Sequence, residues 1–201
     1  MTRKHLIRAA IALASTVPSL VNAQQQSESY KFLTAVKEAK GNDVVAILDR
    51  PGSNIINTKE RGSGDGALHI VTKRGDITYL RYLLQKGADP NIRDDRGNTP
   101  MILAVQGGHR DMIPVLATAR ANPNLGNQSG VTPLILAVQA RSIDMVRLLL
   151  AAKADPDEAD RLAGQSARDY ANNDPRNGAI AKLLAETPKR TRAAVAGPTL
   201  R

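Results

Sequence analysis

The sequence contains no cysteine and no tryptophan, and its aromatic residues are one phenylalanine and four tyrosines among 201 residues. The absence of cysteine excludes disulfides, thiolate metal ligands and cysteine nucleophiles. Because aromatic side chains are scarce, a core has to be built from Ala, Val, Leu, Ile and Met. Such small side chains favour thin layers of closely packed helices. Hydrophobic residues make up 42% of the chain, which argues against a disordered protein.

A concentrated basic stripe is also missing, although the chain carries a net charge of +9. Arg3, Lys4 and Arg8 lie near the N-terminus, and without them 25 basic residues face 19 acidic ones, a net charge of +6. Four further basic residues lie at the other end: Lys189, Arg190, Arg192 and Arg201. A nucleic-acid binder would need clustered positive charge with stacking aromatics. We therefore expect no specific nucleic-acid partner.

Residues 1–23 have the features of a secretory signal peptide. A basic start is followed by an apolar run that ends at Val21 and is too short to span a bilayer comfortably. Val21 and Ala23 occupy the two positions that a signal peptidase reads. We expect cleavage near Ala23 and a periplasmic or secreted protein without stable membrane insertion. An uncleaved membrane anchor is the alternative.

The chain repeats itself with a constant, 33-residue period. Gly97-Asn-Thr-Pro-Met-Ile and Gly130-Val-Thr-Pro-Leu-Ile are one period apart, and Gly64-Asp-Gly-Ala-Leu-His precedes them by the same step. The step also relates three tetrapeptides: Ala88-Asp-Pro-Asn, Ala121-Asn-Pro-Asn and Ala154-Asp-Pro-Asp. A fixed period without insertions predicts a stack of small units that bury their apolar faces against one another.

Each unit is predicted to hold two short helices. Thr99 and Thr132 can cap a first helix whose initial residue is proline, where the missing N–H costs nothing. That helix should end at Gly107-Gly108 or near Arg141. Pro114 should delay the second helix of its unit to about Met112 or Ile113. Helices of two or three turns are marginal alone in water, so the units have to stack.

These units resemble the ankyrin repeat, on the strength of the Thr-Pro segments, the Leu68-His69 pair and Gly87-Ala-Asp-Pro-Asn. The resemblance implies an all-α solenoid of antiparallel helix pairs with projecting loops. It covers residues 30–186, with repeats at about 30–59, 60–92, 93–125, 126–159 and 160–186. The outer two repeats are expected to be degenerate caps. Residues 24–29 are predicted to be a short linker, and residues 187–201 a disordered basic tail.

Residues 61–76 also allow a different interpretation. Gly62, Gly64 and Gly66 precede a helix, and residues 54–57 could form a strand, so the parts of a phosphate-binding loop are present. The repeat register instead aligns Gly64 with the turn glycines of the later units. Asp65 would repel phosphate, and no Lys-Ser/Thr follows the glycines. A nucleotide- or phosphate-binding protein or enzyme that uses the Gly62–Gly66 loop is therefore kept as the alternative hypothesis.

Reactive clusters are not evident in the sequence. His69 and His109 are the only histidines after the predicted signal peptide, and no pair of histidines has the spacing of metal ligands. The resemblance implies that His69 bonds to neighbouring backbone. We therefore expect no catalytic residues, no metal and no cofactor.

The resemblance implies that partner choice depends on loop-tip and inner-helix surface positions. The first hypothesis is accordingly a monomeric, non-enzymatic, exported scaffold that binds another protein. The candidate residues are Ser63, Asp65, Lys73, Arg74, Asp95, Arg96, Asn98, Gln106, Gln128, Ser129, Val131, Gln139 and Arg141.

The signal-peptide interpretation predicts that the mature protein begins at Gln24. N-terminal sequencing of the exported protein measures this directly. A soluble cytosolic protein that begins at Met1 would contradict both the cleavage and the location.

Overall fold

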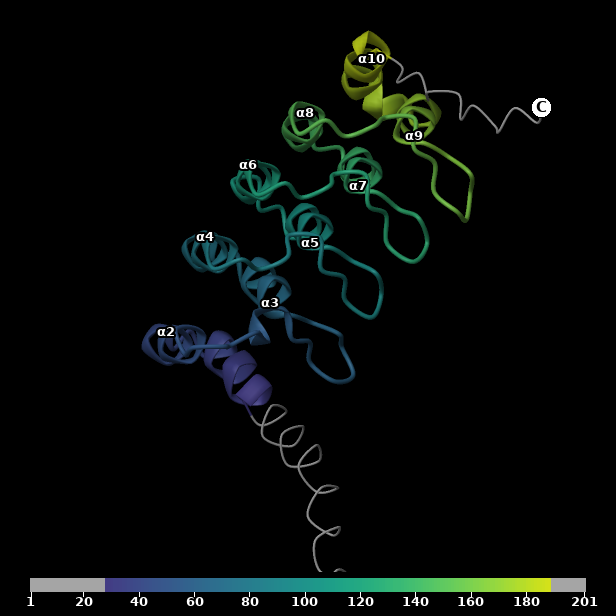
Figure 1. The fold of residues 1–201 in the computed structure, drawn as a ribbon. Coiled ribbons are helices and arrows are strands. Elements are labelled where there is room, and N and C mark those ends of the chain that lie inside the picture. Colours follow the sequence, from purple (N-terminus) through teal and green to yellow (C-terminus); the bar gives the residue numbers. More distant parts are fainter. Residues whose placement is uncertain (1–27, 189–201) are drawn as a thin grey trace, which may run out of the picture.

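The computed structural model describes residues 28–188, which form five helix pairs arranged in two layers (Figure 1). The inner layer consists of residues 28–37, α3 (Ala67–Arg74), α5 (Pro100–Gln106), α7 (Pro133–Gln139) and α9 (Ala167–Asn173). The outer layer consists of α2 (Gly41–Leu48), α4 (Ile77–Gln85), α6 (Met112–Thr118), α8 (Ile143–Ala151) and α10 (Gly178–Glu186). Across residues 28–188 there are isolated bridges but no strand. The predicted all-α solenoid is confirmed.

The predicted signal peptide, residues 24–27 of the predicted linker and nearly all of the predicted tail lie outside the described residues. The last two linker residues, however, are helical rather than irregular. The Glu28 carboxylate accepts a hydrogen bond from the Arg50 guanidinium at 2.9 Å, which ties this helix to the chain after α2.

The segment that could have been a strand, residues 54–57, is instead a short 3-10 helix, η1 (Ile55–Asn57). Ile55 is buried in the core, and the Asn57 side chain accepts a hydrogen bond from the Asp89 N–H at 2.8 Å. The segment therefore connects two stacked units and has no neighbouring strand to pair with. A second 3-10 helix, η2 (Pro175–Asn177), precedes α10.

The predicted helix starts and ends agree with the structure. Thr99 Oγ1 accepts a hydrogen bond from the Ile102 N–H, and Thr132 Oγ1 accepts one from the Ile135 N–H, each at 3.3 Å. The helix α6 begins at Met112, shortly before Pro114, as the proline predicts. Arg141 has a φ of +54°, in a position that earlier units fill with a glycine.

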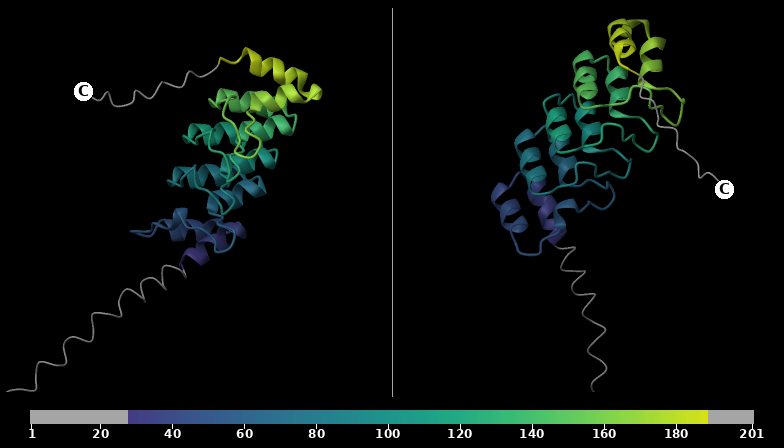
Figure 2. Two further views of the ribbon diagram at one scale, coloured as in Figure 1. Left: turned by 90° about the vertical axis from the view of Figure 1, so that its right-hand side faces the viewer. Right: turned by 45° about the horizontal axis from the view of Figure 1, so that its top comes forward.

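The core is a continuous layer of aliphatic side chains between the inner and outer helices. Its fully buried large residues include a single aromatic, Phe32. The inner helices pack along the stack, α3 against α5, α5 against α7 and α7 against α9. Because the helices of the central units are short, each depends on this packing for its stability. Figure 2 shows the resulting stack from two further sides.

The loops that precede the inner helices project to one side of the stack (Figure 1), and hydrogen bonds join each loop to the next. Backbone N–H groups at each tip donate to the carbonyl of the preceding loop: Asp95 to Ser63 (3.1 Å), Gln128 to Arg96 (3.0 Å) and Arg161 to Ser129 (2.9 Å). Both donors and acceptors advance by the 33-residue step. We call this row of bonded tips the loop ladder.

The loop ladder explains the repeated glycine. Gly64, Gly97 and Gly130 have φ values of +68°, +75° and +76°, a region that side chains with a Cβ disfavour. A Cβ on Gly64 would also lie 2.5 Å from the Asp95 nitrogen of the next loop. Glycine is needed at these positions for both the backbone conformation and the close approach of the following loop.

A second row of contacts follows the connections between units. The side-chain oxygens of three asparagines accept hydrogen bonds from backbone N–H groups of the next unit: Asn57 from Asp89 (2.8 Å), Asn91 from Asn122 (2.7 Å) and Asn124 from Asp155 (2.7 Å). Successive units are thus joined by backbone hydrogen bonds at the loop tips and by asparagine side chains at the connections between units.

Replacing Gly64 by alanine should destabilise the protein more than replacing Gly164. Gly164 has a similar φ of +64°, but nothing lies within 4 Å of a Cβ placed there because no further loop covers it. Gly164→Ala should cost about 1–2 kcal/mol from the backbone conformation alone. Gly64→Ala should cost roughly 1–3 kcal/mol more from the clash with the next loop. Urea unfolding of both variants measures the difference, and equal losses would show that loop contact is unimportant.

Candidate functional site

The loop tips of the second to fourth units and the inner helices α3 and α5 line a groove of about 840 Å³. It lies between the loop ladder and the exposed ends of α3 and α5. Its lining residues are Gly62, Ser63, Lys73, Asp94, Asp95, Arg96, Asn98, Leu103, Gln106, Gly107, Asn127, Gln128 and Ser129. We call this the inner groove. Its walls are held by the loop ladder, so its shape is set before any partner arrives.

Many of the candidates selected from the sequence meet in the inner groove. They come from three successive units: Ser63, Lys73, Asp95, Arg96, Asn98, Gln106, Gln128 and Ser129. Gln139 lies one period after Gln106 and is exposed on α7, and Val131 is half-buried beside the fourth loop. Residues related by the 33-residue step thus lie along one groove, and their role in binding stays a prediction.

Asp65 and Asn98 do not have the exposed surface positions assumed for them. Asp65 is 9% exposed, and both of its carboxylate oxygens accept hydrogen bonds from the Lys73 ammonium, at 2.8 and 2.7 Å. Asn98 is 6% exposed and donates from its side-chain amide to Asp94 at 2.9 Å. Their side chains stabilise the loops, because a buried polar group must find a partner within the protein.

Two of the arginine candidates are also held by internal contacts. The Arg74 guanidinium donates to the Val36 carbonyl at 2.8 Å, which joins α3 to the first unit. Arg141 donates to the Asp174 carboxylate at 3.0 and 3.1 Å. Hydrogen bonds from Arg176, followed by that from Arg141, hold the pKa of Asp174 well below its usual range. Arg74 and Arg141 are both exposed, as surface candidates should be, but these internal contacts use part of each guanidinium group.

Asp94 organises the third loop from within. Its carboxylate accepts hydrogen bonds from the Arg96 N–H at 2.9 Å and the Asn98 N–H at 2.7 Å. Burial acts to raise the pKa of Asp94, but these bonds and the Asn98 amide favour the carboxylate more and lower it. Asn127 repeats the arrangement one unit later, accepting from Ser129 and Val131. Asp94 and Asn127 are therefore loop-forming residues at the floor of the inner groove.

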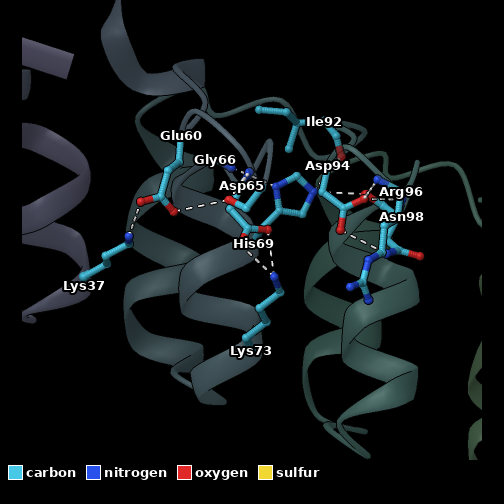
Figure 3. Close-up of polar contacts among 11 residues, drawn as sticks. Lys37, Glu60, Asp65, Gly66, His69, Lys73, Ile92, Asp94, Arg96 and Asn98 are labelled. Carbon is cyan, nitrogen blue, oxygen red and sulfur yellow. Dashed lines mark hydrogen bonds and ion pairs between the residues drawn. The ribbon is translucent and has the colours of Figure 1, made fainter. Parts of the chain in front are cut away.

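His69 is fully buried and bonds to the backbone of its own unit and the next (Figure 3). Its Nδ1 accepts from the Gly66 N–H at 2.9 Å, and Nε2 lies 3.1 Å from the carbonyls of both Ile92 and Asn98. This pattern requires a neutral ring with the proton on Nε2. Burial lowers the pKa of His69, partly opposed by the bond to Asn98. The structural role inferred for His69 from the resemblance agrees with these contacts.

The glycine-rich loop has few backbone donors available for a phosphate. The Gly64 N–H donates to the Glu60 carbonyl at 3.0 Å, the Asp65 N–H to the Ser63 hydroxyl at 3.2 Å, and the Gly66 N–H to His69. A phosphate cradle requires such N–H groups to converge on the anion. Here they are used to close the turn, which fits the interpretation of this stretch as a repeat turn.

Sequence reasoning missed several residues of this surface. Asp94 and Asn127 line the inner groove and are related by the 33-residue step, which could have identified them. Leu162, at the tip of the fifth loop, is 81% exposed. Arg161 follows Gln128 by 33 residues, but Gly164 follows Gly130 by 34 residues. The fifth loop therefore has one additional residue at its tip, between Arg161 and Gly164. The change of step obscured the alignment of Leu162 with the earlier loops.

Other types of site were sought within residues 28–188. In this range, histidine, aspartate and glutamate side chains nowhere gather in threes as a metal ion would require. Among the helices described, none combines the length and apolar composition needed to cross a membrane.

Comparison with known proteins gives a consistent family. A family model for ankyrin repeats (3 copies) matches residues 32–127 and 68–160. An ankyrin repeat protein of fowlpox virus (strain NVSL) is 31% identical over 103 residues, which are 47% of this chain and 54% of that protein. Osteoclast-stimulating factor 1 of Gallus gallus is 41% identical over 54 residues, 27% of each chain. A potassium channel of Arabidopsis thaliana is 44% identical over 55 residues, 27% of this chain and 6% of the channel. The matches thus span about half or less of each relative.

The environment of His69 predicts a loss of stability on mild acidification. Its pKa is lowered in the fold, so below about pH 6.5 the unfolded chain takes up a proton that the folded chain does not. The free energy of unfolding should therefore fall as the pH drops from about 6.5 towards the lowered pKa. Urea unfolding at several pH values measures this slope. His69→Gln should be less stable at neutral pH and should lose this part of the slope, and an unchanged slope would contradict a neutral buried imidazole.

Proposed function

Since the chain belongs to the ankyrin repeat family, we propose that it is a non-enzymatic scaffold that binds another protein in the inner groove. Ankyrin repeats generally serve as protein–protein interaction modules. The observation that supports the inner groove as the binding surface is the meeting of side chains from three successive units beside a fixed loop ladder. A pre-formed surface loses less conformational entropy on binding than a mobile one.

The groove offers polar groups that remain available to a partner. Within residues 28–188, the side chains of Arg96, Gln106 and Ser129 have no hydrogen-bond partner, whereas those of Lys73 and Gln128 do. In the lining of the inner groove, these side chains lie beside backbone of the loop tips and beside Leu103 of α5. Such a surface suits a polar segment of a folded protein that can satisfy these donors and acceptors. The exposed side chain of Leu162 extends the same row of loop tips with an apolar contact.

The proposal includes export and a monomeric state. Its support for export is the basic and apolar N-terminal sequence with Val21 and Ala23 before the expected cut. The partner would then be a protein of the periplasm or of the extracellular space. The alternative, a nucleotide or phosphate ligand at Gly62–Gly66, has less support because the loop donors are already used.

Site-specific photo-crosslinking tests the proposed surface. A photoreactive amino acid at Gln106 or Ser129 should crosslink to one protein in the exported fraction, because both positions face the inner groove. The same amino acid at Lys31 or Lys182, which are exposed on the end units, serves as the matched control. Mass spectrometry identifies the crosslinked protein.

Equal crosslinking at the groove and control positions would contradict the groove as the binding surface. A rise in melting temperature with nucleotides or sugar phosphates, lost in Gly62→Ala, would favour the alternative ligand instead. A Cβ at Gly62 meets nothing within 4 Å, but the φ of +90° disfavours alanine, so the melting temperature of ligand-free Gly62→Ala is measured alongside.

A further inference from the structure

The outer helices of the three central units and the residues just after them carry a net positive charge, unlike the rest of the described chain. Residues 77–87, 110–120 and 143–153 hold six basic residues, all exposed, and two acidic ones: Arg81, Lys86, Arg110, Arg120, Arg147, Lys153, Asp111 and Asp144. Their net charge is +4, whereas residues 28–188 together, with 21 basic and 19 acidic residues, have a net charge of +2. The rest of the described chain is therefore net negative. This separation of charge marks one side of the molecule.

Several of these basic side chains have no partner in the described part of the chain. Arg110 pairs with Asp144 and Lys86 with Asp49. No ion pair or side-chain hydrogen bond within residues 28–188 involves the other four: Arg81, Arg120, Arg147 and Lys153. Their charges are free to meet groups on another molecule.

The surface is hollowed on both sides of α6. A depression of about 410 Å³ lies between α4 and α6 and is lined by Arg81, Leu84, Gln85, Pro114, Val115, Thr118 and Ala119. A second depression, of about 520 Å³, lies between α6 and α8 and is lined by Arg110, Asp111, Pro114, Asp144, Arg147 and Leu148. Pro114 is common to both. We call this surface, from Arg81 across Pro114 to Arg147, the outer face.

The repeat register explains the notch at the centre of the outer face. Arg81, Pro114 and Arg147 occupy the same position of three successive units, each one repeat step from the next. Where the flanking units extend a long cationic side chain, the middle unit has only a proline ring. The largely aliphatic hollow between α4 and α6 is bounded by the unpaired Arg81 guanidinium. The hollow between α6 and α8 is bounded by the unpaired Arg147 guanidinium and also contains Asp111 and the Arg110–Asp144 ion pair.

We propose that the outer face binds an acidic amphipathic helix of a partner protein. An apolar side chain of that helix would enter the notch beside Pro114 and Val115, and carboxylates would meet Arg81 and Arg147. Adjacent packed helices are about 8–10 Å apart, so Arg81 and Arg147 lie on backbones roughly 20 Å apart. A helix rises about 1.5 Å per residue, and about 13 residues would span this distance.

The chemistry of the outer face favours a peptide over a nucleic acid. Helices α6 and α8 contain no aromatic residue on which bases could stack, and the two tyrosines of α4, Tyr79 and Tyr82, do not line either depression. The notch is lined largely by aliphatic groups, which a sugar–phosphate backbone would not fill. This surface is separate from the inner groove, and the proposal does not depend on the function assigned to that groove.

Fluorescence anisotropy with defined peptides tests the proposal on the purified protein. The probe is an alanine-rich helical peptide with two glutamates near each end, about 13 residues apart, and one central leucine. It should bind, and its counterpart with lysine for glutamate should not. Arg81→Glu with Arg147→Glu should weaken binding about tenfold, because two attractive contacts become repulsive. Lys31→Glu with Lys182→Glu, the same change of net charge elsewhere, should have little effect.

Pro114→Arg separates the notch from simple charge attraction. It restores the residue type of the neighbouring units, adds a positive charge and fills the hollow. If the proposal is right, Pro114→Arg binds the leucine peptide more weakly than the unmodified protein does. Replacing the peptide's leucine by alanine should then weaken binding to the unmodified protein but not to Pro114→Arg. Tighter binding by Pro114→Arg would overturn the proposal. Circular dichroism checks that each variant keeps its helix content.

Two further measurements can overturn the proposal. If a short duplex DNA binds in an Arg81- and Arg147-dependent manner while the acidic peptide does not bind, the outer face is a nucleic-acid surface. If Arg96→Glu with Gln106→Glu weakens the acidic peptide as much as the outer-face variant does, the peptide binds in the inner groove. That result would leave the proposed function of the inner groove standing.

Discussion

Each unit of this protein depends on direct backbone contact with its neighbours. Its central helices are too short to be stable alone, so every helix pair needs an adjacent pair against which to bury its aliphatic face. The loop ladder adds a close approach at the tips, where one backbone nitrogen reaches the carbonyl of the preceding loop. Gly64, Gly97 and Gly130 make this approach possible. The distance between successive units is consequently fixed by contacts between helices and by contacts between loops.

The contacts between units restrict the residue types on the inner side of the stack more than those on the outer side. On the inner side, loop and helix residues must satisfy the neighbouring unit, and Asp65, Asp94 and Asn98 are occupied with internal hydrogen bonds. On the outer side, side chains face solvent and their type can change from unit to unit. The position that is arginine in two units, at Arg81 and Arg147, can therefore be proline in the unit between them, at Pro114, without loss of the fold. Binding surfaces can form on either side, but only the inner one is pre-shaped by the contacts that hold the units together.

The second unit shows how a departure from the repeat is compensated. Gly66 and Ala67 replace the Thr-Pro pair that starts α5 and α7, so α3 lacks a hydroxyl cap. The His69 imidazole accepts a hydrogen bond from the Gly66 N–H and also bonds to the Ile92 carbonyl of its own unit and the Asn98 carbonyl of the next. A buried neutral histidine is often part of a catalytic site. Here the three hydrogen bonds to backbone explain why a histidine occupies this position. Because they require a neutral ring, protonation of His69 would weaken the junction between the two units.

The sequence alone determined the period, the helix pairs, their caps and the glycine turns, because these follow from local patterns repeated at a fixed spacing. Thr99 and Pro114 predicted helix starts from their own chemistry, and the 33-residue step placed most groove residues on one side. Burial and partner choice were decided by the tertiary structure. Asp65 faces Lys73, and Arg141 faces Asp174 in the following unit, contacts that no local pattern specifies. Whether a polar residue at a surface position is free to bind depends on neighbours that only stacking brings within reach.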